Sequence, residues 1–417
     1  MTSPPSPTHL IRAHSVDVSA LFFSDDNERL YSGDASGRVV VTSTRSLRAI
    51  VTWSAHTDSI LGIEEWGTRI VTHSRDHKLH IWTRFEDLPA SERVGGSAAL
   101  SDLPTPTLCY SLDVNALNYC RFSLLPTSPR DEALIALPNL VESSEADVWA
   151  LPSRKRIHAS VGTQRTESIF SSGGREGMRV GLIMALHLFR VLPSTDSASA
   201  CEGELRLICA YEDGSVALRR FVGSGTHTDT EPELSVEGRG WEVVWQSKLH
   251  VEASSSFIHS WIKVRIVEIS QVMAMRVSRD NHFALTVSAD HLVGRYELVP
   301  QTSASSAGVV YRTKHQGNGC IAIRDDGRVC AIGGWDGRIR LYSTKNLKPL
   351  GTLRYHKNGC QAVEFAHQLH ATPATDDEDD DDDELSMEEQ EARGRWLAAG
   401  AKDHRVSLWT LISFEKT

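Results

Sequence analysis

A short pattern recurs along the whole chain and limits the folds that it can adopt. A turn containing Asp or Gly is followed by alternating apolar residues, and the run usually ends on an aromatic residue six positions after the Asp. In "AIGGWDGRIRLYS" (331–343) these positions hold Asp336 and Tyr342. Further copies lie at 75–82, 212–219, 289–296 and 402–409, with degenerate copies at 36–42 and 143–149. Such repetition predicts a repeat architecture.

A histidine stands before most copies, at the end of a short apolar run. His56 precedes Asp76 by 20 residues, and His315 precedes Asp336 by 21. Two further strand-like runs lie between these marks, so each unit is predicted to form four short strands. Four-stranded units of roughly 40 residues with these marks are typical of WD repeats, and seven of them predict an all-β, seven-bladed WD-repeat β-propeller.

The register of the repeats predicts how the propeller closes. The strand before each histidine is expected to be the outer strand of the preceding blade. Residues 8–13 have this form with no blade before them, so we expect them to pair with the last blade. The chain is predicted to form one domain over 1–417, with blades at about 14–53, 56–115, 116–157, 178–249, 271–312, 315–354 and 356–414. The insertion 366–394 in the last blade is expected to be disordered.

Histidine, serine, aspartate and aromatic residues recur at matching positions. The second blade has His56, Ser74, Asp76 and Trp82. A hydrolase would use such a set once, whereas these residues recur in part from blade to blade. We therefore predict structural hydrogen-bonded chains, since buried polar groups need partners. The further predicted members are His250, Ser288, Asp290, Tyr296, His315, Asp336, Tyr342, His356, Asp403 and Trp409.

No pattern of residues indicates catalysis or cofactor binding. The sequence has no G-x-x-x-x-G-K-[ST] phosphate loop and no H-E-x-x-H, and its seven cysteines include no C-x-x-C pair. We expect no enzymatic activity, no cofactor and no bound metal. The odd number of cysteines favours a reducing compartment. No stretch is apolar enough to predict a membrane span.

The residue just before each turn Asp is a candidate contact for partners. The strand order predicts that the His-bearing loops and the Asp-bearing turns share one face, here called the top. Exposed Arg and Trp on a rigid scaffold are frequent hot spots of binding. The candidates are Arg75, Glu212, Trp335 and Lys402.

The net charge of −10 is concentrated in one segment. The run "DDEDDDDDE" at 376–384 carries nine negative charges, which leaves the rest of the chain near −1. The run is either a solubilising loop or a contact for a basic partner such as a histone. A nearly neutral body gives no reason to expect direct nucleic-acid binding.

Longer phrases resemble one family. The phrases "VTHSRDHKLHIW", "ALNYCRFS", "ALPN", "IRDDGRVCAIGGWDGRIRLYS" and "LAAGAKDHRVSLW" are similar to the fungal ASTRA-associated WD-repeat protein family, which is related to the animal Gβ-like WD-repeat proteins. The resemblance implies a non-catalytic scaffold subunit of the ASTRA complex, linked to chromatin remodelling and to assembly or maturation of PI3-kinase-like kinases. The partners it implies are a Tra-type PI3-kinase-like protein, the Tel and Tti co-chaperones and the RuvB-like ATPases. A nuclear location is expected, with the cytoplasm as a second one.

Two other kinds of propeller remain as alternatives. A Gβ-like signalling subunit would need an N-terminal coiled-coil helix. About ten residues precede the first predicted strand, and we expect these to be too few for such a helix. A ubiquitin-ligase substrate adaptor would want a separate helical docking segment, which the sequence does not indicate. Both alternatives share the predicted fold, so only their partners distinguish them from a scaffold subunit.

Overall fold

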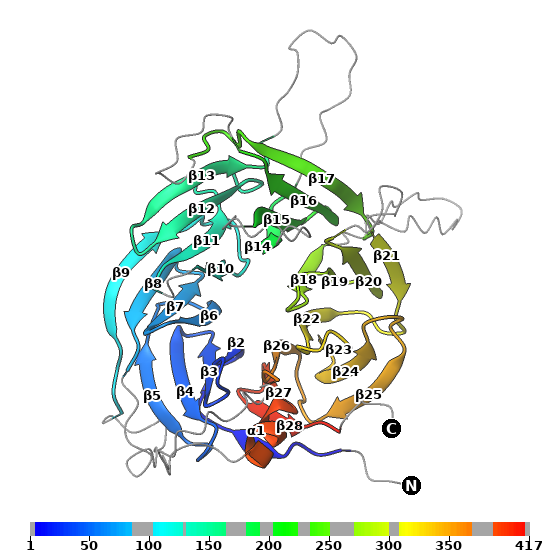
Figure 1. Ribbon diagram of the computed structural model, residues 1–417. Helices are drawn as coiled ribbons and strands as arrows, with labels where there is room; N and C mark the ends of the chain where they lie inside the picture. Colours follow the sequence, from blue (N-terminus) through cyan, green and yellow to red (C-terminus); the bar gives the residue numbers. More distant parts are fainter. Residues whose placement is uncertain are drawn as a thin grey trace, which may run out of the picture. The chain divides into compact units, whose positions relative to one another are not determined.

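Seven four-stranded antiparallel sheets form the described part of the chain (Figure 1). The computed structural model describes residues 5–85, 103–127, 131–163, 181–191, 203–223, 234–250, 271–299, 308–368 and 387–412. These residues fall into two compact units: unit 1 contains Met1–Asp113, Arg276–Asp280 and Gly317–Thr417, and unit 2 contains Val114–Met275 and Asn281–Gln316. The predicted fold class, a seven-bladed β-propeller, is confirmed.

Unit 1 contains the first, second, sixth and seventh sheets. The first and second sheets are β2 (Val18–Phe23), β3 (Arg29–Asp34), β4 (Arg38–Ser43) and β5 (Ala49–Ser54), then β6 (Ile60–Trp66), β7 (Arg69–Ser74), β8 (Lys78–Thr83) and β9 (Thr107–Asp113). The sixth and seventh are β22 (Asn318–Ile323), β23 (Val329–Gly334), β24 (Arg338–Ser343) and β25 (Pro349–Arg354), then β26 (Cys360–Phe365), β27 (Trp396–Ala401), β28 (Val406–Thr410) and β1 (His9–Ile11).

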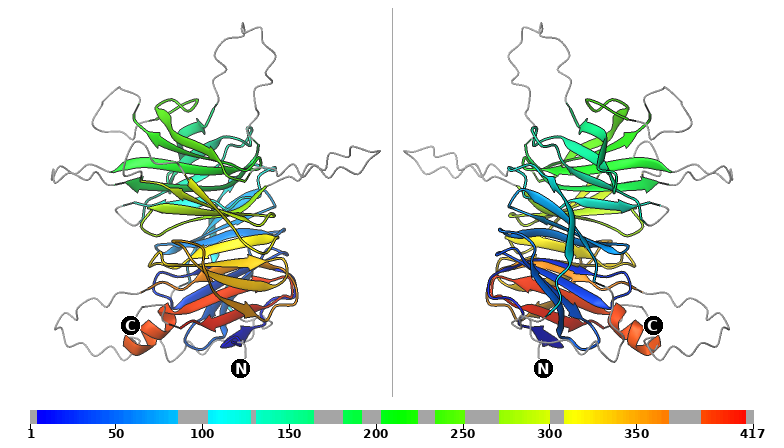
Figure 2. Two further views of the ribbon diagram at one scale, coloured as in Figure 1. Left: turned by 90° about the vertical axis from the view of Figure 1, so that its right-hand side faces the viewer. Right: turned by 90° about the vertical axis from the view of Figure 1, so that its left-hand side faces the viewer.

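The N-terminal strand completes the seventh sheet, as predicted. β1 pairs antiparallel with β28, with His9 opposite Leu408 and Ile11 opposite Val406. Figure 2 shows β1, in dark blue, beside the red strands of this sheet. The last blade is therefore built from both ends of the chain.

Unit 2 contains the remaining sheets, except that the last two residues of β18 belong to unit 1. The third sheet is β10 (Ser123–Pro126), β11 (Ala133–Pro138), β12 (Ala146–Leu151) and β13 (Lys155–Val161). The fourth is β14 (Ile183–Val191), β15 (Glu204–Tyr211), β16 (Ser215–Phe221) and β17 (Trp241–Lys248). The fifth is β18 (Val272–Val277), β19 (Phe283–Ser288), β20 (Leu292–Glu297) and β21 (Gly308–Arg312).

Close contact between neighbouring sheets forms the core of unit 1. All six residues of β3 are buried. A methyl group added at Gly33 would lie 2.7 Å from the side chain of Ile60 in the next sheet, and one at Gly400 would lie 2.6 Å from Val18. Only glycine permits this approach. The second strand of a blade is thus pressed against the inner strand of its neighbour.

The insertion of the last blade ends in a helix, which corrects the expectation that 366–394 is disordered throughout. Helix α1 (Met387–Gly394) precedes β27. Arg393 is buried and donates to Thr44 Oγ1 at 3.0 Å, and its guanidinium lies 6.0 Å from the ring of Trp396. This anchor holds the helix on the first sheet.

The acidic run 376–384 lies outside the described residues. Within the described ranges, no helix is long and apolar enough to cross a membrane.

Candidate functional site

A hydrogen-bonded chain of four side chains supports the top of the second sheet. Trp82 Nε1 donates to Thr72 Oγ1 at 2.9 Å, and Thr72 Oγ1 lies 2.8 Å from His56 Nε2. His56 Nδ1 lies 3.0 Å from each carboxylate oxygen of Asp76. A neutral imidazole that donates from Nδ1 and accepts at Nε2 satisfies every link. The chain ties the loop before β6 to the turn between β7 and β8.

Thr72 takes the position that the sequence analysis gave to Ser74. Ser74 Oγ instead donates to the carbonyl of Asp58 at 2.7 Å and accepts from the N–H of Asp76 at 3.3 Å. Both residues lie on β7, two positions apart, and alternate residues of a strand face the same side. Ser74 ends the strand beside the loop, whereas Thr72 lies deeper and reaches the histidine.

The same arrangement recurs in the fifth sheet with the same shift. His250 Nδ1 lies 3.2 Å from Asp290, and its Nε2 lies 2.9 Å from Thr286 Oγ1. Ser288, the predicted member, accepts from the N–H of Asp290 at 3.4 Å. Burial raises the pKa of Tyr296, which stands in the aromatic position. The hydroxyl that meets the histidine again lies four residues before the turn Asp.

The seventh sheet obtains its hydroxyl from the following strand. His356 Nδ1 lies 2.9 Å from Asp403, and its Nε2 lies 2.7 Å from Ser407 Oγ. Trp409 Nε1 donates to the same hydroxyl at 2.9 Å. Ser407 lies four residues after the turn Asp, at a position that the repeat pattern does not predict to carry the hydroxyl.

The first sheet keeps the chain although its expected turn position holds Ser36. His14 Nδ1 lies 2.8 Å from Asp34, and its Nε2 lies 2.7 Å from Ser32 Oγ. Asp34 also accepts from the N–H and the hydroxyl of Ser36 at 2.9 and 2.6 Å. An aspartate two positions earlier therefore replaces the missing one.

The sixth sheet uses an arginine, which corrects the predicted pair of Asp336 and His315. Arg340 Nη1 donates to Asp336 Oδ1 at 3.1 Å, and Arg340 Nη2 reaches the other carboxylate oxygen at 2.5 Å. The side chain of His315 is exposed. Tyr342 fills the aromatic position, and burial raises the pKa of its hydroxyl. An arginine on β24 can bind both carboxylate oxygens at once, so it replaces the histidine as the partner of the turn.

The geometry of Thr72, His56 and Asp76 is that of a hydrolase triad, but its hydroxyl is inaccessible. Thr72 is 0 % exposed and is already bonded to both Trp82 and His56. A nucleophile has to reach a substrate, and a catalytic triad occurs at one site only. Related chains occur in three further sheets. The arrangement therefore supports turns and has no access to a substrate.

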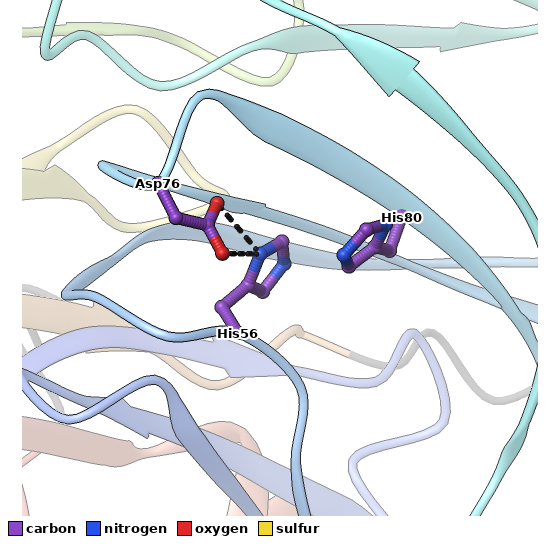
Figure 3. A group of neighbouring side chains, drawn as sticks. All are labelled: His56, Asp76 and His80. Carbon is purple, nitrogen blue, oxygen red and sulfur yellow. Dashed lines mark hydrogen bonds and ion pairs between the residues drawn. The ribbon is translucent and has the colours of Figure 1, made fainter.

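His56, Asp76 and His80 offer possible metal ligands within 4.8 Å of one another. Figure 3 shows Asp76 facing one nitrogen of His56, with His80 beside the same imidazole. The two imidazoles are stacked, with centroids 4.4 Å apart and planes 15° from parallel. Both nitrogens of His56 are hydrogen-bonded, to Asp76 and Thr72. A metal ion would have to break this chain, so the group fits a structural role better than a metal site.

Two buried histidines of the second sheet predict a loss of stability in acid. Burial lowers the pKa of His56 to about 4, against the opposing attraction of Asp76, and burial lowers the pKa of His73 to about 3. Because these folded values lie below the ordinary 6.5, the unfolded chain binds more protons as the pH falls below 6.5, and stability is lost from there down to about 3. Each histidine contributes up to about 2 kcal/mol of loss between pH 6.5 and 5.

Urea unfolding at pH 7 and pH 5 measures this loss. His73→Leu removes one of the two buried imidazoles. The free energy of unfolding of this variant is therefore expected to fall less between pH 7 and pH 5 than that of the wild type. Equal pH dependence of the two chains would show that His73 does not stay neutral in the folded state.

Three of the four candidate contacts are exposed at the top of unit 1. Arg75 and Lys402 are exposed, and Trp335 is 54 % exposed. Glu212, in unit 2, is less exposed than these three: it is half-buried, and its carboxylate accepts a hydrogen bond from Gln271 at 2.8 Å. The backbone N–H of each of the four donates to the loop that leads into the inner strand of its own sheet, at Ser59, Leu182, Gly317 and Gly359. The turns thus hold these residues at equivalent positions.

Trp335 and Lys402 belong to one continuous surface. The indole of Trp335 lies flat against backbone that carries no side chains: a methyl group at Gly317 or Gly319 would lie 2.8 or 3.2 Å from it. Gly359 contacts the backbone of Trp335, and its carbonyl accepts from the N–H of Lys402 at 3.1 Å. The exposed Lys357 lies on the same loop. An exposed indole among cationic side chains suits binding to an acidic partner with an apolar residue.

Comparisons with known proteins agree with this architecture. The family model "WD domain, G-beta repeat" matches residues 5–43 and 309–343. The solved β-propeller domain of Cps50 (Swd1) from Myceliophteria thermophila is similar in fold, with a TM-score of 0.58 at 12 % identity over 98 % of this chain and 100 % of that one. At this identity the likeness concerns the fold alone.

Relatives of similar length come from many fungi, and all those named below are called ASTRA-associated protein 1. The protein of Verticillium alfalfae is 32 % identical over 99 % of this chain and 94 % of its own length. That of Penicillium rubens is 30 % identical over 98 % of each chain. That of Schizosaccharomyces pombe is 27 % identical over 98 % of this chain and 99 % of its own. The chain therefore belongs to the ASTRA-associated protein 1 family of WD-repeat proteins.

Proposed function

We propose that this chain is a non-catalytic scaffold subunit of the ASTRA complex and acts in the nucleus. The observation that carries the proposal is the near full-length similarity to relatives named for their association with ASTRA. A scaffold role agrees with buried His, Asp and hydroxyl groups that are committed to one another. The finer role proposed is assembly or maturation of PI3-kinase-like kinases and support of chromatin remodelling.

The surface proposed to serve this role is the top of the sixth and seventh sheets. Trp335 supplies an apolar anchor, and Lys402 and Lys357 supply positive charge beside it. Aromatic anchors surrounded by charged residues commonly dominate the energy of an interface. The proposed partners are a Tra-type PI3-kinase-like protein, the Tel and Tti co-chaperones and the RuvB-like ATPases.

Affinity purification of the tagged chain at physiological salt, with quantitative mass spectrometry, tests the association. The RuvB-like ATPases and a Tel–Tti complex are expected to be recovered with it, well above an untagged control and a tagged unrelated propeller. If neither the RuvB-like ATPases nor the Tel–Tti complex is recovered above these controls, the proposal is contradicted. Recovery of G-protein subunits or of ubiquitin-ligase components in their place would favour one of the alternative classes.

A further inference from the structure

The third sheet, in unit 2, has a network of asparagines at its top. Asn115 Nδ2 donates to the carbonyl of Asn139 at 2.6 Å, and Asn139 Nδ2 donates to Asp147 at 3.0 Å. Asn118 Nδ2 lies 2.9 Å from the carbonyls of both Ser143 and Ile183. All three asparagines are buried. The network fixes the loop 114–122, which leads into β10, against the turn 139–145 between β11 and β12.

Four large apolar side chains project from these two fixed segments. Leu117, Tyr119, Leu140 and Val141 are 62, 51, 56 and 80 % exposed. Asn115 accepts from the N–H of Leu117 at 2.7 Å, and Asn139 accepts from the N–H of Val141 at 2.9 Å. Because Asn115 and Asn139 are bonded to each other, the four side chains lie on adjoining loops.

This apolar surface contributes little to folding, since its side chains remain largely in water. Single exposed apolar residues are common, but a cluster on rigid backbone marks a site of interaction. Buried amides hold the backbone in place, so the surface pays little conformational entropy on binding. Tyr is also among the residue types enriched in interfaces.

The charges around the surface are mainly negative. The loop 114–122 and the turn 139–145 contain Glu142 and Glu145, and their single cation, Arg121, is only partly exposed. The turn of the next sheet adds Glu212, whose backbone N–H donates to Leu182 at 2.9 Å, and the following residue, Ile183, donates to Ser143 at 3.0 Å. A segment with positive charges beside its apolar residues would complement this rim.

We propose that Leu117, Tyr119, Leu140 and Val141 form a docking surface for a segment of a partner protein in which large apolar residues are flanked by Lys or Arg. This inference goes beyond the proposed function, because it specifies the chemistry of the segment and does not require its owner to be an ASTRA subunit. It also places a second contact on a sheet other than those of Trp335 and Lys402.

Site-specific photo-cross-linking in the full chain identifies what covers this surface. Benzoylphenylalanine at Leu140 is compared with the same probe at Val243, which is equally exposed at 56 % but lies on β17. After purification of the chain with its associated proteins, mass spectrometry maps each cross-link. The probe at Leu140, and not the one at Val243, is expected to mark an apolar segment flanked by Lys or Arg in another protein.

A synthetic, fluorescently labelled peptide with the cross-linked sequence then measures the contact by anisotropy. Leu117→Ser combined with Val141→Ser is expected to weaken peptide binding roughly tenfold or more, because it removes the apolar anchors. Glu142→Lys is expected to weaken it several-fold and to reduce its salt dependence. Val243→Ser is the matched control and should bind as the wild type does.

Several results would overturn the inference. These are cross-links from Leu140 to a second copy of the chain, to residues 164–180 of the same chain, or to an acidic segment, and the absence of any cross-link above the Val243 control. Unchanged peptide affinity of the Leu117→Ser, Val141→Ser chain would also overturn it. Purification of the tagged wild type tests only the ASTRA association, whereas cross-linking and peptide binding test only the docking surface. Either proposal can therefore fail while the other holds.

Discussion

Thr72→Val is expected to lower the free energy of unfolding by about 2–4 kcal/mol. Valine keeps the shape of threonine but leaves Trp82 Nε1 without its acceptor and His56 Nε2 without its donor. Both groups lie in the buried part of the second sheet, where water cannot replace the hydroxyl. Urea unfolding followed by tryptophan fluorescence measures the loss.

Two substitutions in the same strand separate this effect from general damage. Thr72→Ser keeps the hydroxyl and loses one methyl group, so a cost of about 1 kcal/mol is expected. Ser74→Ala removes the bond to the carbonyl of Asp58, again at about 1 kcal/mol. If Ser74→Ala cost as much as Thr72→Val, the hydroxyl of Thr72 would not be the centre of the chain.

The sequence predicted the architecture well because the fold repeats. In most sheets a turn Asp, usually with an aromatic residue six positions later, precedes the third strand, and the histidine before it precedes the inner strand. The pairing of β1 with β28 followed from the same phase, since residues 8–13 look like an outer strand without a blade. The strand order and the closure of the last sheet follow from residue types that recur at fixed spacing, and such recurrence is visible in a single sequence.

The partners within each polar chain were less predictable. Residues two and four positions before the turn Asp face the same side of a strand, so Ser74 and Thr72 could not be told apart by alternation. The position four residues after the Asp is equally variable: it holds His80 beside the chain, Arg340 as the partner of Asp336, and Ser407 as the hydroxyl. Sequence spacing identifies these candidate positions. The length and direction of each side chain determine which residue joins the hydrogen-bonded chain.

The asparagine network was missed for a different reason. The repeat pattern depends on histidine and aspartate, and the third sheet has neither in the usual positions. The phrases "ALNYCRFS" and "ALPN" contain Asn118 and Asn139 but indicated only a family resemblance. Their structural meaning appears once Asn115, Asn118 and Asn139 are seen to join two loops.

Trp335→Ser combined with Lys402→Glu is expected to lower recovery of ASTRA subunits roughly tenfold or more. The first change removes an indole that is 54 % exposed, and the second reverses a charge beside it. Neither side chain belongs to a polar chain that supports a turn, but the indole packs on the backbone of Gly317 and Gly319, so the free energy of unfolding should fall by about 1–2 kcal/mol. Partner recovery is therefore compared between equal amounts of folded protein.

The matched control changes residues of the same kinds at other positions. Ile412 is 74 % exposed and Lys155 is exposed, so Ile412→Ser with Lys155→Glu makes an equal change in exposed apolar area and in charge. This control should recover ASTRA subunits as the wild type does. A similar loss in both chains would indicate a general effect of charge on the complex.

The most direct test of the account is the ratio of RuvB-like ATPases and Tel–Tti proteins to tagged chain, measured by quantitative mass spectrometry from equal amounts of folded protein. The account predicts that the Trp335→Ser, Lys402→Glu chain gives roughly a tenth of the wild-type ratio or less, while the Ile412→Ser, Lys155→Glu chain gives the wild-type ratio. An unchanged ratio for the Trp335→Ser, Lys402→Glu chain would contradict the claim that this surface binds the complex.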